Sequence, residues 1–233
     1  MIRQFMVSLL KILHQNEIKM KVSSSKEKIL KKIREALSNP VPLPFPKSEG
    51  TNSVFQPQTE DLEIIFAEEF TKLLGKFAFC VSEADMKLQL EKLFVEKKWT
   101  NIYCIEDTLL KIFDGSKLPS FNQSTLADCD ASITSCKYLV ARTGTIVMTS
   151  AQQSGRTVSA YAPVHICIAY LNQLVYDTRD ALKLLKKDYG ANLPSFITFA
   201  AGPSRTADIE KTLVVGVHGP KEVYLFLIDE ASK

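Results

Sequence analysis

Apolar residues recur with two spacings between residues 59 and 233, and the two spacings alternate along the chain. Helical spacing marks residues 61–74, 82–97, 107–113 and 178–189. Short apolar runs typical of strands lie at residues 76–81, 101–105, 131–136, 144–150, 165–170, 194–200 and 223–229. Strands that alternate with helices predict an α/β fold whose sheet is mainly parallel and covered on both faces. Ligands of such sheets bind at the carboxyl ends of the strands, so we expect a ligand site at that edge.

The N-terminal part of the chain follows a different pattern. Ser24 and Glu27 have capping-box spacing and open an amphipathic helix with apolar residues at 29, 30, 33 and 37. Four prolines in residues 39–46 (NPVPLPFP) exclude a regular helix there and predict an extended linker. The sequence therefore predicts an N-terminal extension (1–22), a helix with a Pro-rich linker (23–58) and one α/β domain (59–233).

The first fifteen residues, MIRQFMVSLLKILHQ, resemble a signal peptide only briefly. Lys11 interrupts the apolar run and no small-residue cleavage site follows, so we reject that interpretation. The run is also too short to span a bilayer. Met1 and Met20 both remain candidate start sites, and we expect residues 1–20 to pack poorly.

Composition and charge are those of a globular protein, with 45% apolar residues and a net charge of +3. Residues 1–40 carry nine basic and three acidic side chains, which is typical of a solvated helix face and does not require nucleic acid. The five cysteines form no C-x-x-C pair, so we expect a reducing, cytoplasmic location and no zinc or iron–sulfur ligands in this chain. Dinucleotide, P-loop and H-E-x-x-H fingerprints are absent from the sequence.

Two polar segments precede buried strands and are candidates for a site. In ARTGTIVMT (residues 141–149), Gly144 permits a tight turn and Thr143 and Thr145 offer hydroxyl groups. In QQSGRTVSAYAPVHI (residues 152–166), Arg156 follows a glycine turn and His165 enters a strand. A plain turn and a structural histidine are the alternative interpretations of these two segments.

A third segment, AAGPSRTADIEKTLVVGVHGPKE (residues 200–222), is unusually polar for a connection between two strands. Residues 203–206 follow a strand where a helix or turn would begin, so free backbone N–H groups and Arg205 favour an anion there. His218 lies in a second tight turn. The candidates in this segment are Gly202, Ser204, Arg205, Thr206, Asp208, Glu210, His218 and Gly219.

The polar side chains of this third segment are also compatible with roles besides anion binding. Arg205, Asp208 and Glu210 could form a structural ion-pair network that holds the segment in place. A hydrolase triad of Ser204, Asp208 and His218 is disfavoured, because Thr206 breaks the G-x-S-x-G elbow. A metal site at the two histidines lacks the short ligand spacing that such sites show.

The segments ARTGTIVM, SGRTVSAYAPVHI and GPSRTADIEKTLVVGVHGPKEVYLFLID together resemble the LUD-domain family, and within it the lactate-utilization C proteins. The resemblance implies a Rossmann-like three-layer sandwich similar to the sugar-phosphate isomerase and coenzyme A transferase-like superfamily. It implies a role in oxidising L-lactate to pyruvate in the bacterial cytoplasm, with iron–sulfur clusters on partner proteins. Many members have an acid where this chain has Arg142, which we expect to make the pocket more positive.

The favoured hypothesis is therefore a subunit without redox chemistry of its own, with Arg156, Arg205 and Arg142 holding lactate or a similar anion. His165 or His218 would serve as general base, since the pKa of histidine lies nearest neutrality. A stand-alone enzyme acting on a phosphorylated or coenzyme A-linked substrate, and an assembly or interaction module, stay open as alternatives. The sequence leaves open whether the chain catalyses a reaction alone.

Overall fold

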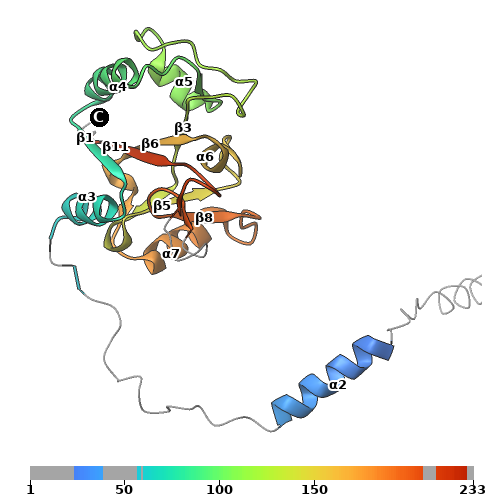
Figure 1. Cartoon of the computed structure of the whole chain (residues 1–233). Coiled ribbons are helices and arrows are strands. Elements are labelled where there is room, and N and C mark those ends of the chain that lie inside the picture. Colours follow the sequence, from blue (N-terminus) through green and yellow to red (C-terminus); the bar gives the residue numbers. More distant parts are fainter. Residues whose placement is uncertain (1–23, 39–56, 59, 207–213, 230–233) are drawn as a thin grey trace, which may run out of the picture. The chain divides into compact units, whose positions relative to one another are not determined.

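The structure, a computed structural model, describes residues 24–38, 57–58, 60–206 and 214–229 (Figure 1). The chain divides into two units, Met1–Gln56 and Pro57–Lys233. Helix α2 (Ser24–Ser38) of the first unit coincides with the predicted amphipathic helix, and its apolar residues Ile29 and Ile33 are exposed. The expectations for residues 1–22 and for the Pro-rich segment 39–46 lie outside the described residues.

A five-stranded parallel sheet forms the centre of the second unit (Figure 1). Its strand order is β1-β11-β6-β3-β2. The strands are β1 (Lys76–Cys80), β2 (Ile102–Tyr103), β3 (Ala131–Ser135), β6 (Val164–Tyr170) and β11 (Glu222–Ile228). All five coincide with predicted apolar runs, and the mainly parallel central sheet predicted from the sequence is confirmed.

Two helices cover one face of this sheet, α4 (Glu83–Lys97) and α5 (Asp107–Phe113). Alternate strand residues such as Ile166, Ile168 and Phe226 pack against the buried face of α4. The predicted N-cap is present, because the Ser82 hydroxyl accepts a hydrogen bond from the backbone N–H of Asp85 at 3.2 Å.

The opposite face of the parallel sheet is covered mainly by a second sheet, which the sequence pattern did not predict. Its strands, in spatial order, are β7 (Leu174–Val175), β4 (Tyr138–Val140), β5 (Thr145–Thr149) and β8 (Ile197–Ala200). Helix α3 (Leu62–Lys72) packs into the same core, and α7 (Thr178–Tyr189) covers the outer face of the second sheet (Figure 1). Both faces of the parallel sheet are therefore covered, as predicted, by helices α4 and α5 on one face and by the second sheet with α3 on the other.

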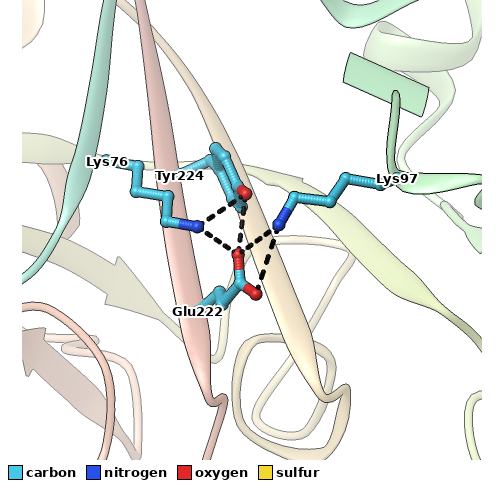
Figure 2. Close-up of polar contacts among 4 residues, drawn as sticks. All are labelled: Lys76, Lys97, Glu222 and Tyr224. Carbon is cyan, nitrogen blue, oxygen red and sulfur yellow. Dashed lines mark hydrogen bonds and ion pairs between the residues drawn. The ribbon is translucent and has the colours of Figure 1, made fainter. Parts of the chain in front are cut away.

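Figure 2 shows a charged cluster at the amino ends of β1 and β11. Glu222 accepts hydrogen bonds from Lys76, from the Tyr224 hydroxyl at 2.7 Å and from Lys97 at 3.3 Å. Burial opposes the charge on Glu222, but the hydrogen bonds from Lys76 and Tyr224 outweigh it and lower the pKa of Glu222 to about 2. The cluster joins the edge strand to its neighbour and to the end of α4.

Short elements complete the described fold. They are α6 (Val158–Tyr161), β9 (Arg205–Thr206), β10 (Val214–Val215) and two 3₁₀ turns, η1 (Ala141–Thr143) and η2 (Leu171–Gln173). Among the helices in the described ranges, none combines the length and apolar character that crossing a membrane requires.

Candidate functional site

A cavity of about 220 Å³ lies between the two sheets at one end of the second unit. We call it the inner cavity. Its lining residues come from β5, β6, β8 and β11, from the segment around α6 and from the connections before β9 and β11. They are Met148, Arg156, Ser159, Ala160, His165, Phe196, Thr198, Ala200, Gly202, Ser204, His218, Gly219, Pro220 and Val223.

The inner cavity lies at the amino ends of the parallel strands, because His165 and Val223 are the second residues of β6 and β11. We expected the site at the carboxyl ends of the strands, so this expectation does not describe the inner cavity.

A buried carboxylate occupies the carboxyl end of β3. Both oxygens of Glu106 accept hydrogen bonds from the Ser135 backbone N–H, at 3.2 and 3.1 Å, and Gln152 donates to the Ser135 carbonyl at 3.2 Å.

Six of the residues chosen from the sequence meet at the inner cavity. They are Arg156, His165, Gly202, Ser204, His218 and Gly219. Segments that are distant along the chain thus form one wall. Sequence reasoning missed Ser159, Thr198 and Phe196, which are ordinary surface or strand residues in the one-dimensional pattern and gave no signal.

His165 is a buried histidine that lies within hydrogen-bond distance of a threonine hydroxyl. Its side chain is 1% exposed, and its Nε2 lies 2.8 Å from Oγ1 of Thr134 on the adjacent strand β3. Burial lowers the pKa of His165 from 6.5 to about 4, because the imidazolium would lose its hydration. His165 is therefore uncharged at neutral pH and is suited to hydrogen bonding rather than to holding an anion by charge.

Arg156 supplies the cationic group of the inner cavity. Its guanidinium lies 5.7 Å from the centre of the Phe196 ring and donates a hydrogen bond to the Ser195 hydroxyl. Within the part of the chain that the structure describes, no carboxylate pairs with it. This cation–π contact helps to position the guanidinium and leaves its charge available to an anionic ligand.

Backbone hydrogen bonds hold the two turns that carry Ser204 and His218 together. The Ser204 N–H donates to the Pro220 carbonyl at 3.0 Å, and the Gly216 N–H donates to the Ser204 carbonyl at 2.9 Å. Gly219 allows this approach, since a Cβ atom there would lie 3.0 Å from Cβ of Ser204. Ser204 and His218 are therefore placed as one unit at the rim of the inner cavity.

Of the helix or turn expected at residues 203–206, no helix is present. Arg205 and Thr206 instead form β9, which pairs with Val215 and Val214 of β10 in an antiparallel ladder. The Ser204 N–H is already bonded to a carbonyl and is not free for an anion. Arg205 is exposed and does not line the inner cavity, while Asp208 and Glu210 lie outside the described residues.

Thr143, Gly144 and Thr145 also lie outside the lining of the inner cavity. Their turn packs on α3, where a Cβ atom on Gly144 would lie 2.5 Å from the backbone nitrogen of Phe70. The hydroxyls of Thr143 and Thr145 lie 2.8 Å apart and bond to each other. This geometry gives the turn a packing role in holding α3 against the second sheet.

Arg142 does not add charge to the inner cavity. Its Nε donates to Oδ2 of Asp177 at 2.7 Å, and Asp177 is the N-cap of α7. The hydrogen bond from the backbone N–H of Arg179 lowers the pKa of Asp177, and so does the Arg142 guanidinium. Burial acts in the opposite direction but is outweighed. The expectation that Arg142 makes the pocket more positive is therefore wrong, because Asp177 compensates its charge.

Comparison with known proteins places this geometry in context. Residues 9–228 match the LUD domain. Lactate utilization protein C of Halalkalibacterium halodurans is 39% identical over 103 residues, which are 43% of this chain and 45% of that protein. Lactate utilization protein C of Oceanobacillus iheyensis is 32% identical over 126 residues, 53% of this chain and 54% of that protein. The chain thus spans about half the length of the curated relatives it matches.

A solved structure is similar in fold. The crystal structure of a DUF162 family protein from Deinococcus radiodurans superimposes with a TM-score of 0.53 at 18% sequence identity. The match covers 72% of this chain and 96% of that chain. At this level of identity the likeness concerns the fold alone.

Proposed function

Because the chain belongs to the LUD domain family, we propose that it is a lactate-utilization protein, the subunit without iron–sulfur clusters in a cytoplasmic system that oxidises L-lactate to pyruvate. Several similar proteins, among them those of Halalkalibacterium halodurans and Oceanobacillus iheyensis, carry the name lactate utilization protein C. The observation that carries the proposal is the meeting of Arg156, His165 and His218 at one small cavity.

The chemistry of the lining suits a small hydroxy or keto acid. A guanidinium forms two parallel hydrogen bonds with a carboxylate, and Arg156 is the cation that lines the inner cavity among the described residues. Ser204 and the neutral His165 offer hydrogen bonds to the hydroxyl or keto oxygen of such an acid. His218 is exposed at the rim, so we assign it, rather than His165, the role of accepting a proton.

The size of the inner cavity supports the same ligand class. Its volume of about 220 Å³ lies below the range of about 300–1,000 Å³ that is usual for drug-sized ligands. A three-carbon acid fits this volume, whereas a coenzyme A thioester does not fit within it. We therefore place lactate or pyruvate in the inner cavity.

We assign electron transfer to partner proteins that carry iron–sulfur clusters. The five cysteines of this chain are buried thiols on separate strands and connections, without the close spacing of cluster ligands. Affinity purification of the chain from cells grown on lactate should recover cysteine-rich partners with the absorbance of such clusters. Recovery of the chain alone under reducing, anaerobic conditions would contradict this part of the proposal.

Calorimetric titration with lactate and pyruvate tests the ligand. Replacing Arg156 by Gln should weaken binding about ten- to 100-fold, because a hydrogen bond to a charged group contributes roughly 1.5–3 kcal/mol. Arg205→Gln is the matched control, since Arg205 lies outside the lining, and it should change binding by less than about twofold. Equal losses in the two variants, or binding of sugar phosphates but not of lactate, would refute the assignment.

A further inference from the structure

A second and larger cavity adjoins the inner one. Its volume is about 640 Å³, and we call it the outer cavity. The two cavities share three lining residues, Ala160, His218 and Gly219. A volume of this size is within the usual range for cofactors and drug-sized ligands and exceeds what lactate requires.

An exposed aromatic ring forms part of the wall of the outer cavity. Tyr161 ends α6 and is 75% exposed. Among the described residues, none stacks on its ring or hydrogen-bonds its hydroxyl. The neighbouring lining residues Ala127, Ala162 and Pro163 are small or flat, so a planar group has room to lie against the tyrosine ring.

A lysine lies at the same cavity. The backbone N–H of Lys221 donates to the Pro163 carbonyl at 2.8 Å, which fixes the start of its side chain. The stem crosses the backbone of Gly216, where a Cβ atom would lie 2.2 Å from Cγ of Lys221. In the described ranges no carboxylate pairs with the Lys221 ammonium, and His218 lines the same cavity.

From this arrangement we propose that the outer cavity binds a mononucleotide, with its heteroaromatic ring on Tyr161 and its phosphate at Lys221. An inorganic anion would use the lysine but not the ring, and an apolar ligand would use the ring but not the lysine. Bases stack on aromatic side chains regardless of their identity, and lysine binds phosphate as a compact charge. Lactate has neither a ring nor a phosphate, so this site is additional to the proposed acid site.

His218 connects the two sites. Because His218 lines both cavities, a bound nucleotide and a bound acid would meet at its imidazole. The outer site nevertheless has its own contacts, since Tyr161 and Lys221 do not line the inner cavity. Each site can therefore be tested while the other stays intact.

The test is equilibrium titration of the full chain with adenosine monophosphate and flavin mononucleotide, alongside adenosine and inorganic phosphate. At least one mononucleotide should bind saturably and more tightly than inorganic phosphate. Tyr161→Ala should weaken that binding at least about fivefold, the lower end of the contribution of base stacking, while Tyr161→Phe should retain it. Lys221→Met should weaken binding of the mononucleotide but not of adenosine, and Lys187→Met, on the exposed side of α7, should change neither.

Two results would overturn the inference. One is the lack of saturable binding by both mononucleotides, and the other is equal affinity of wild type and Tyr161→Ala. Thermal unfolding of each variant checks that the fold is kept, which we expect because Tyr161 is mostly exposed. Arg156→Gln separates this inference from the proposed function, since it should weaken lactate binding and leave nucleotide binding unchanged.

Discussion

Acidification should destabilise the protein through His165 before its carboxylates are protonated. The unfolded chain binds a proton at this imidazole below about pH 6.5, whereas the folded chain does so only near pH 4. Between these values the unfolded state holds more protons, so stability is complete above pH 6.5 and is lost as the pH falls toward 4. At pH 4.5 the free energy of unfolding should be about 2–3 kcal/mol lower than at neutral pH, taking 1.36 kcal/mol for each pKa unit.

The pH window separates this effect from that of the acidic groups. The folded-state pKa of Glu222 is about 2 against an ordinary 4.5, and the pKa of Asp177 is also lowered. A carboxyl group with a lowered pKa stabilises the fold above its unfolded pKa, so these contributions stay largely intact down to about pH 4.5. A loss of stability between pH 6.5 and 4.5 therefore reports mainly on His165.

Urea unfolding of wild type and His165→Gln at pH 7.5, 6.5, 5.5 and 4.5 measures the effect. The glutamine amide can keep a hydrogen bond to Thr134 but does not titrate in this range. Wild type should lose about 2–3 kcal/mol more than the variant across the window, whatever the difference between them at pH 7.5. Parallel pH profiles for the two proteins would show that His165 is not held uncharged by burial, and the reasoning would fail.

Two further predictions concern packing and charge. Glu222→Gln should lower the free energy of unfolding by about 1–2 kcal/mol, because Lys76 and Lys97 lose their shared carboxylate. This value is reduced for the partial exposure of Glu222. Urea unfolding measures it with Glu96→Gln as the exposed control, and an equal loss in both variants would contradict the prediction. Gly144→Ala should lower the free energy of unfolding by at least about 2 kcal/mol more than Gly115→Ala does. Both glycines have a positive φ (+54° and +70°), but only at Gly144 would the added Cβ atom clash with the backbone of α3. Similar melting temperatures for the two alanine variants would show that α3 moves away at little cost.

Element identity followed closely from the sequence alone. The spacing of apolar residues predicted α4, α7 and the five central strands, because a helix or strand must bury one face and its period is visible in the chain. The same local information predicted the Ser82 cap. It also identified Arg156, Ser204 and His218 as unusual, since polar residues beside buried strands need a partner or a ligand.

Tertiary structure decided how these elements combine. A short apolar run does not specify which sheet a strand joins, so the sequence did not show that β4, β5 and β8 form a second sheet. That sheet, with β6 and β11, encloses the inner cavity at the amino ends of the parallel strands. The ion pair between Arg142 and Asp177 could not be predicted from the sequence either, because the two residues are thirty-five positions apart and meet only in the folded chain. The periodicity of apolar residues shows which face of a helix or strand is buried. Which residues come into contact across the fold depends on the connections that bring distant segments together.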